Sequence, residues 1–439
     1  MGLSAVLPQT GLGFLSFVCG AFFRSGLLRR VRCYDSDKTM PDPISWYALG
    51  RDVNDPQTIL EAVDEKILTH NLDPSAHGQS DEAVYNHRIS MLLDHVNYSI
   101  YNIKLHPETR PIKAFVDAGG AAEFSKIQDA IDYVHALGGG RIFVKAGTYY
   151  PKDDVSLYSD IQIEGEDRDT VIFDFEDAVY GFEAVGTTGA HLHNIKLDNI
   201  QITQSAKWED GCILFNYVDD ADIVNCKFYD NFHSGESAYS PIVIASCTEL
   251  NIKGNYWSQS KGVTVANGGS KINIEDNYFY NFNAGAISIN AATLVVIRHN
   301  YFDTTGDDAV SLAWNKIVFD GNIFINCTGG CINIEDDNNI ITNNVFVGNV
   351  SEPTGIWSNS NVTGCIITNN RFVGLFGFAI ILNSGGIHTI ANNIATESLT
   401  GLQLESGCNY CSVTGNVFVD CDDPIINSGA GNQLAGNVT

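Results

Sequence analysis

The chain has 439 residues, of which 18% are charged and 41 are glycine, and its formal net charge is −27 at pH 7. This charge excludes nucleic acid as a favourable partner, because phosphate binding requires clustered Lys and Arg. Abundant glycine, asparagine and β-branched residues favour strands and turns over an all-helical fold, and a chain of this length then suits one long repeat structure.

The first 39 residues differ in charge from the rest of the chain. Five basic and two acidic residues give them a balance of +3, which leaves −30 for residues 40–439. The apolar stretch 12–23 is too short to span a bilayer, and its positive charges follow it, whereas those of a secretory signal precede it. We therefore predict no membrane span, and we expect residues 1–39 to be an extension without a folded role, with Met40 as an alternative start.

Residues 40–112 are expected to form a small helical module. Apolar residues recur at helical spacing in ILEAVDEKIL and in EAVYNHRISMLLDH, and a turn-rich stretch separates the two. Histidine and aspartate crowd this segment, where they either bind a transition metal or serve as caps and loop hydrogen bonders. These residues are His70, Asp73, His77, His87, Asp94 and His95.

Part of this module, residues 69–104, carries a family resemblance. The pieces DPSAH, YNHR and LLDH resemble a short module found ahead of variable domains in bacteriophage tail and virion-surface proteins. The resemblance implies an attachment or self-association element. It predicts a homo-oligomer such as a trimer, virion or tail proteins as partners, and a location on a virion surface or outside the cell.

The segment 114–150 begins the main domain. A glycine-rich start precedes an amphipathic helix with Ile127, Ala130, Ile131 and Val134 on one face, and GGGRIFVKAGTY then reads as a strand and turn. This order resembles the first segment of the pectate-lyase-like superfamily, in which the helix caps the open end of a solenoid. We expect an all-β, single-stranded right-handed parallel β-helix over residues 113–439, with the helix as its cap.

From residue 249 the chain repeats an Asn, any residue, then an aromatic, with a period of 22 to 26 residues. We expect each asparagine to adopt the left-handed conformation at a turn and to bond the next rung, and each aromatic to point into the lumen. Looser repeats precede these, so the solenoid should have about ten rungs. The full copies begin at Asn255, Asn277, Asn300, Asn322, Asn344, Asn370 and Asn416, and Asn393 with Ala395 is a degenerate copy.

Most of the eleven cysteines fall inside apolar strand patterns, as at Cys212, Cys247, Cys331 and Cys365, and we expect them to be buried free thiols. Cys408 and Cys411 form a C-x-x-C pair without a second pair at zinc spacing, so core packing is expected there over metal or redox chemistry.

Two adjacent carboxylates, Asp307 and Asp308, interrupt one column of the repeat. Aligning the rungs on asparagine places them where the preceding rung has Ala284-Gly285 and the following rung has Gly329-Gly330. Adjacent carboxylates repel each other and raise one pKa, which suits a general acid. Aspartate is also a common turn residue, and CDDPIIN at 421–427 holds a second pair at an equivalent point, so a turn role is the alternative.

A third acidic cluster, Glu335-Asp336-Asp337, lies one rung on, at the far end of its strand. Glu335, or a groove-facing acid from a neighbouring rung, is the predicted partner of Asp307 and Asp308 in a glycosidase pair. Asp336 and Asp337 are predicted to bind substrate. Such carboxylates also suit calcium, the one cofactor that the sequence suggests. No metal site is assigned.

The motif GDDAVSL resembles the GDD motif of polygalacturonases, and the resemblance implies catalytic roles for Asp307 and Asp308. The chain departs from that family where a further aspartate is replaced by Ala284-Gly285, and its Gly-His-Gly and Arg-x-Lys motifs are absent. Polygalacturonase activity as such is therefore not expected.

Further groove residues are expected in insertions and at strand ends. The insertion 232–241 offers His233, Glu236 and Tyr239, since a loop that interrupts a regular rung often carries function. Tryptophans near strand ends suit sugar stacking, whereas Trp257 occupies a lumen position. The candidates for stacking are Trp208, Trp314 and Trp357.

Two functions of different class follow from these features. The first is a tailspike-like protein that binds a surface polysaccharide in a groove and cleaves it, by hydrolysis or, as the less favoured route, by β-elimination. The second is a non-catalytic structural or adhesive tail protein. Carboxylates that converge within glycosidase distance would favour the enzyme.

Overall fold

The computed structural model describes residues 16–18, 32–34 and 112–439, except 176–180, 204–211, 230–240, 259–261, 283–284, 306–307, 349–352, 360 and 375–376. The chain divides into two units, residues 1–109 and 110–439. In the first unit, β1 (Ser16–Val18) pairs antiparallel with β2 (Arg32–Tyr34), inside the segment for which the sequence predicts no folded role. The expected helical module, apart from residue 112, lies outside the described residues.

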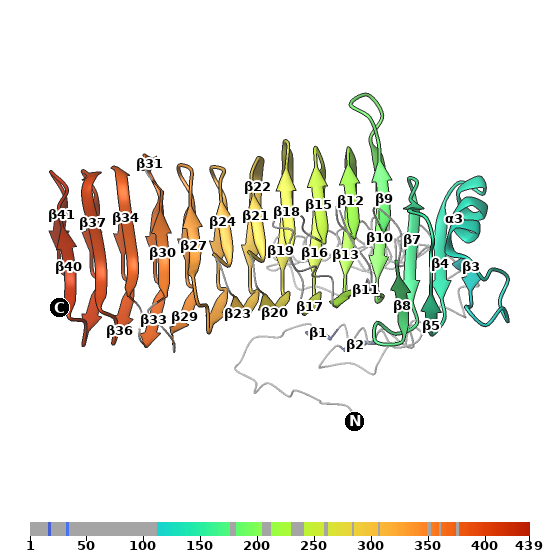
Figure 1. The fold of residues 1–439 in the computed structure, drawn as a ribbon, viewed down its shortest axis with the longest axis horizontal. Helices are drawn as coiled ribbons and strands as arrows, with labels where there is room; N and C mark the ends of the chain where they lie inside the picture. The colour runs from blue at the N-terminus through green and yellow to red at the C-terminus, as the bar shows by residue number, and fades with distance from the viewer. Residues whose placement is uncertain are drawn as a thin grey trace, which may run out of the picture. The chain divides into compact units, whose positions relative to one another are not determined.

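The second unit is a right-handed parallel β-helix. Its strands form three sheets, and every strand pairs in parallel with the equivalent strand of the next rung. Figure 1 shows the rungs stacked in chain order from the helix α3 to the C-terminus. The expected fold class is confirmed.

The three sheets take one strand each from most rungs, in the order sheet I, sheet II, sheet III. Sheet I has 14 strands: β3 (Ile112–Val116), β4 (Gly140–Val144), β7 (Ile161–Gly165), β10 (Leu192–Asp198), β13 (Val218–Val224), β16 (Thr248–Lys253), β19 (Gly269–Glu275), β22 (Ala292–Arg298), β25 (Val318–Asp320), β28 (Ile340–Thr342), β32 (Ile366–Thr368), β35 (Thr389–Ala391), β38 (Ser412–Thr414) and β41 (Gln433–Ala435). Sheet II has 12 strands: β5 (Gly147–Tyr149), β8 (Val171–Asp174), β11 (Gln201–Thr203), β14 (Lys227–Tyr229), β17 (Tyr256–Ser258), β20 (Tyr278–Phe282), β23 (Tyr301–Thr305), β26 (Ile323–Ile325), β29 (Val345–Gly348), β33 (Arg371–Gly374), β36 (Ile394–Thr396) and β39 (Val417–Val419). Sheet III has 13 strands, counting the short β31 (Val362–Thr363) beside β34: β6 (Val155–Ser156), β9 (Phe182–Val185), β12 (Ile213–Asn216), β15 (Ile242–Ala245), β18 (Val263–Ala266), β21 (Ile287–Ile289), β24 (Val310–Leu312), β27 (Gly330–Ile334), β30 (Thr354–Ser358), β34 (Phe378–Gly386), β37 (Thr400–Asn409) and β40 (Asp423–Asn427).

The turn from sheet I to sheet II is the same in successive rungs and contains the repeated asparagine. The expected asparagine column is confirmed: the Asn322 Oδ1 accepts hydrogen bonds from both the backbone N–H and the Nδ2 of Asn300, at 2.9 and 3.0 Å. Asn344 serves Asn322 in the same way, and the ladder continues to Asn437. The ladder asparagines before Asn437 are buried and hydrogen-bonded, so the ladder satisfies backbone groups that would otherwise lack partners in the core.

The left-handed residue of this turn is not the ladder asparagine, which corrects the sequence-based expectation. It is the residue before it, with φ of 56° at Asp276, 55° at His299 and 65° at Gly321. Asparagine tolerates the left-handed conformation well, but here its side chain forms the ladder. The residue before it therefore adopts the left-handed conformation.

The lumen is filled by the predicted aromatic column. Phe279, Phe302, Phe324 and Phe346 are buried and stack with ring centroids 4.5 to 4.9 Å apart, and Trp257 extends the same column. Ala395 occupies the degenerate position between Phe372 and Phe418. The aromatic residues that repeat in the sequence thus stack from rung to rung into a continuous apolar core.

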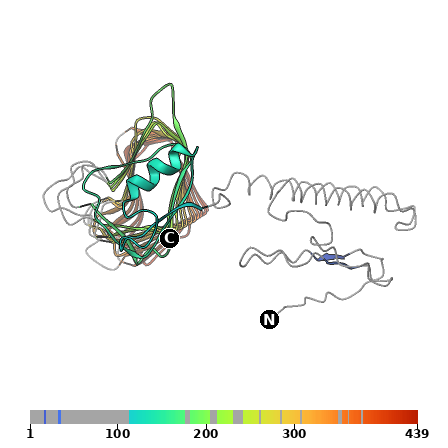
Figure 2. The same ribbon diagram turned by 90° about the vertical axis from the view of Figure 1, so that its right-hand side faces the viewer.

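The helix α3 (Ile127–Ala136) covers one end of this core. Its buried residues are the four that the sequence placed on its apolar face, Ile127, Ala130, Ile131 and Val134. Gly138, at φ 81°, follows the helix and ends it in the left-handed conformation. Figure 2 shows α3 lying across the end of the solenoid.

The described cysteines bear out the expected free thiols: eight of the nine are buried and none is in a disulfide. Cys408 and Cys411 are among the buried ones, in keeping with core packing. Within the described part of the chain, helices are too short or too polar to cross a membrane.

Candidate functional site

The connections from sheet II to sheet III differ most in length among the rungs. They range from residues 397–399 in one rung to residues 230–241 in another. At this corner, on the outer face of sheet III, a hollow of about 400 Å³ opens over several rungs. We call it the Asp308 pocket, and its lining residues are Asp308, Thr328, Gly329, Gly330, Pro353, Thr354, Trp357, Phe378, Ile381 and Asn383.

A hydrogen bond between Asp308 and Trp357 crosses the middle of the pocket. The Trp357 Nε1 donates to the Asp308 Oδ1 at 3.0 Å, although the two residues lie two rungs apart. Gly330 belongs to the rung between them, and a Cβ there would lie 2.2 Å from the Asp308 Oδ1 and 2.7 Å from the Trp357 Nε1. The glycine therefore provides the space in which carboxylate and indole meet.

The register of sheet III explains why an aspartate at this point differs from its neighbours. The Ala286 N–H bonds the Ala309 carbonyl and the Ala309 N–H bonds that of Gly330, so Asp308 lies between Gly285 and Gly330 in one column. Asp423 occupies the same column farther along, in register with Thr400. The sequence alignment of Asp308 is confirmed, while Asp307 lies outside the described residues.

Buried thiols lie beneath the pocket. Cys327 and Cys331 flank its lining residues 328–330, and both are buried. Burial, the hydrogen bond that the Cys331 thiol donates to Cys327, and the charge of Asp308 together raise the pKa of Cys331 well above its usual value. Cys331, which directly follows the lining residue Gly330, is therefore a neutral thiol.

Glu335 is not brought beside Asp308. It follows β27 at its far end, five residues beyond Gly330, which at about 3.3 Å per residue is roughly 16 Å along the strand. Its Oε1 accepts hydrogen bonds from the Ser311 Oγ at 2.7 Å and the Asn333 Nδ2 at 3.0 Å. Glycosidase pairs lie within about 5 to 10 Å of each other, so Glu335 and Asp308 do not form one.

Asp336 and Asp337 shape the turn after β27. The Asp336 Oδ1 accepts the Asp337 backbone N–H at 2.7 Å, and the Asp337 Oδ1 accepts that of Thr363 at 2.6 Å. Neither residue lines the Asp308 pocket. These two oxygens are occupied by backbone donors, and the predictions of substrate or calcium binding here have no geometric support.

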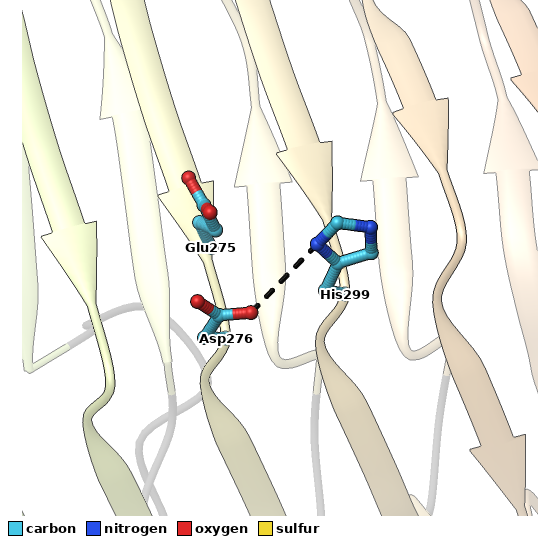
Figure 3. A group of neighbouring side chains, drawn as sticks. All are labelled: Glu275, Asp276 and His299. Carbon is cyan, nitrogen blue, oxygen red and sulfur yellow. Dashed lines mark ion pairs between the residues drawn. The ribbon is translucent and has the colours of Figure 1, made fainter. Parts of the chain in front are cut away.

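One group of three side chains among the described residues has metal-ligand spacing: Glu275, Asp276 and His299. Figure 3 shows Asp276 directed toward His299 on the neighbouring rung, with Glu275 beside it. Arg298 bonds the Glu275 Oε2 at 2.8 Å, and Lys253 lies 3.3 Å from both the Glu275 Oε1 and the Asp276 Oδ2.

These two cations balance the two carboxylates. Although burial raises the pKa of Glu275, the hydrogen bonds from Arg298 and Lys253 hold it below its usual value. A divalent cation would have to displace both ion pairs, so we interpret the group as an ion-pair network on the outer face of sheet I.

The tryptophans predicted to stack on sugars lie in different surroundings. Trp357 lies in the pocket, whereas Trp314 lies in the turn after β24, packs against the core, and buries an Nε1 that has no hydrogen-bond partner among the described residues. The remaining predicted binding residues, Trp208, His233, Glu236 and Tyr239, lie outside the described part of the chain.

Sequence reasoning missed most of the pocket wall. Thr354 and Phe378 share the column of Gly330, and Ile381 shares the column of Asn333 and Trp357. The signal that could have found Thr354, Phe378 and Ile381 is the strand register: an alignment of the rungs along sheet III places these residues near Asp308, whereas a search for acids and tryptophans does not.

Comparison with known proteins identifies the fold. Residues 211–372 match the family model described as "Right handed beta helix region", and no curated protein matches the chain. The chain is similar to the A-module of the mannuronan C-5 epimerase AlgE4 of Azotobacter vinelandii, with 15% identity over 71% of this chain and 95% of that one and a TM-score of 0.57. It is also similar to DFA-IIIase of Arthrobacter chlorophenolicus A6 in complex with DFA-III, with 10% identity over 75% and 98% of the chains and a TM-score of 0.55. At these identities the likeness concerns the fold alone.

Proposed function

We propose that this protein binds a polysaccharide in the Asp308 pocket and cleaves it by hydrolysis. The observation that carries the proposal is the Asp308–Trp357 pair above Gly330 in an open hollow. An indole face packs on the apolar face of a sugar ring, and a carboxylate accepts hydrogen bonds from its hydroxyl groups. The volume of about 400 Å³ lies in the range of small-ligand sites, so it would hold one or two sugar units.

The solenoid suits a polymeric ligand. Ser311, Asn333, Trp357, Ile381 and Gln403 follow one another in register along the outer face of sheet III. Strands repeat at about 4.8 Å, so a chain molecule laid along this face meets a similar surface at every rung. An epimerase with this fold is named for its action on mannuronan, which agrees with a polymeric carbohydrate as ligand.

The cleavage chemistry would be shared by Asp307 and Asp308. The hydrogen bond from the Trp357 N–H would hold the Asp308 carboxylate in place, and this carboxylate would take the proton from the attacking water. Asp307 would protonate the glycosidic oxygen of the leaving sugar. Water is thereby added across the bond, and both residues return to their starting states after proton exchange.

A non-catalytic adhesive protein is the second candidate. One observation favours it: of the described residues that line the pocket, Asp308 alone carries a carboxylate. In both cases we propose a homo-oligomer on a virion surface or outside the cell, and residues 69–104, with their resemblance to virion-surface modules, support this.

The test is a panel of bacterial surface polysaccharides, scored for binding and for release of reducing ends. Trp357→Ala is expected to abolish binding, and Asp308→Asn to reduce cleavage by roughly 100-fold or more with the fold intact. Asp423→Asn, in the same column but outside the pocket, is the matched control and should behave as the parent.

Binding without turnover by the parent would select the adhesive function. Binding and cleavage that survive Trp357→Ala and Asp308→Asn unchanged would refute the proposed site.

A further inference from the structure

We propose that the glycan recognised by the Asp308 pocket is uncharged. This inference rests on the proposed function and assigns its substrate class. Three properties carry it: the charge of the rungs around the pocket, the position of their few cations, and the chemistry of the lining.

Residues 300–439, which form the rungs at and beyond the pocket, contain two basic residues, Lys316 and Arg371. They contain thirteen acidic residues, so their formal net charge is 2 − 13 = −11. The acidic residues are Asp303, Asp307, Asp308, Asp320, Glu335, Asp336, Asp337, Glu352, Glu397, Glu405, Asp420, Asp422 and Asp423.

Neither basic residue lies on sheet III. Arg371 is the first residue of β33 in sheet II, and Lys316 lies in the turn before β25 of sheet I. The single histidine of this stretch, His388, is buried, and burial lowers its pKa to about 4, so it carries no charge at neutral pH. The face of sheet III beside the pocket therefore has no cation among its described residues.

A polyanionic glycan would bring a negative charge to such a face with almost every sugar. Each pair of like charges 4 Å apart costs about fivefold in affinity even in bulk water, and the acids along sheet III act together. Recognition of carboxylate or sulfate groups normally uses Arg or Lys, which the described face lacks.

The lining instead matches hydroxyl groups. Thr354 offers a hydroxyl. The Thr328 hydroxyl donates to the Thr305 carbonyl and offers its oxygen as an acceptor, and the Asn383 Nδ2 has a second N–H beside the one that bonds the Ser358 carbonyl. Asp308 offers a further acceptor. Trp357 supplies an apolar ring face. These groups satisfy an uncharged sugar without a counter-ion.

The experiment compares uncharged polysaccharides with their own carboxymethylated derivatives. Dextran, mannan, galactan and β-glucan, each in both forms, are titrated onto the full chain at 20 and 500 mM NaCl, with 5 mM EDTA or with 2 mM CaCl₂. We expect at least one uncharged form to bind, and its carboxymethylated form to bind at least tenfold more weakly at 20 mM NaCl. The gap should narrow at 500 mM NaCl, because salt screens the repulsion.

A charge-reversal variant sharpens this test. Glu405 lies on β37, in the rung after Asn383. Glu405→Lys changes the local charge by two units, so it should raise the affinity for the carboxymethylated form by at least roughly fivefold and leave the uncharged form within twofold. Asp320→Lys, which reverses a charge on β25 of sheet I, is the control and should change neither.

Equal or tighter binding of a carboxymethylated form would overturn the inference, and a dependence on CaCl₂ would identify calcium as the bridge. If Trp357→Ala abolished binding of the carboxymethylated form, the proposed pocket would be supported and the inference of an uncharged ligand would be refuted. If no polysaccharide of either kind bound, or if Trp357→Ala changed nothing, the inference and the proposed function would fall together.

Discussion

The hydrogen bond between Asp308 and Trp357 depends on Gly330, which lies in the rung between them. In the column that Asp308 shares with Gly285 and Gly330, the absence of a side chain at Gly330 lets the Trp357 indole reach Asp308 from two rungs away. The sequence revealed the acid, because it interrupts small residues, and it revealed the tryptophan as a separate candidate. It did not reveal their contact, because strand register alone does not say how far an indole leans along a sheet.

Gly330→Ala tests this arrangement at the scale of one methyl group. The new Cβ would lie 2.2 Å from the Asp308 Oδ1, so carboxylate and indole must separate. We expect glycan affinity to fall by roughly tenfold or more with a loss of stability of about 1 kcal/mol or less, since the position is on the surface. Titration with the bound glycan and chemical denaturation measure the two effects.

Gly285→Ala is the control for this substitution. Its Cβ would lie 3.1 Å from the Asp308 carbonyl oxygen and away from the indole. Equal affinity of both alanine variants and the parent would show that the hydrogen bond does not shape the site.

At the scale of the element, the sequence predicted the residue columns at the turn from sheet I to sheet II but not which residue of the turn is left-handed. The 22 to 26 residue period fixed the asparagine and aromatic columns, because a repeat of that length is typical of one solenoid rung. The conformation was assigned to the wrong residue of the turn, since asparagine is common in both roles. The pairing of Glu335 with Asp308 failed for a related reason: rung neighbours in sequence alignment lie at opposite ends of a strand.

Asn322→Ala is expected to destabilise the solenoid by roughly 2 to 5 kcal/mol. The backbone N–H and the Nδ2 of Asn300 would lose their buried acceptor, and the Ile297 carbonyl would lose a donor. Asn437→Ala, at the more exposed end of the ladder, should cost less than half as much, because water replaces the lost bond. Equal losses in urea denaturation would contradict the burial argument.

His388 gives the solenoid a predictable response to acid. Its Nδ1 accepts a hydrogen bond from the Cys365 backbone N–H. At the equivalent turn of other rungs, the Oδ1 of Asn339 or Asn432 accepts the corresponding backbone N–H. Burial lowers its pKa to about 4. The unfolded histidine takes up a proton near pH 6.5, so its contribution to stability is complete above that pH and is lost as the pH falls toward 4.

We expect this group to remove about 3 kcal/mol of the free energy of unfolding between pH 7 and pH 4. His388→Asn keeps an acceptor for Cys365 and removes the titration, so its stability should depend less on pH in that range. A variant with the same pH profile as the parent would assign the acid response to other groups.

For the whole molecule, the fold follows from the sequence repeat, whereas the proposed function rests on residues that depart from the repeat. The periodic pattern was enough to predict the core. The pocket arises where Asp308, Gly330 and Trp357 lie in three successive rungs, with Asp308 interrupting a column of small residues. The charge of −11 over residues 300–439 then restricts the ligand in a way that no single residue does.

The most direct test of the central claim is a crystal structure of the protein with an oligosaccharide from the glycan that it binds. We predict a sugar ring packed on the indole of Trp357, with a hydroxyl donating to Asp308. A sugar bound on sheet I or sheet II, with the pocket of Asp308 left unchanged, would contradict the account.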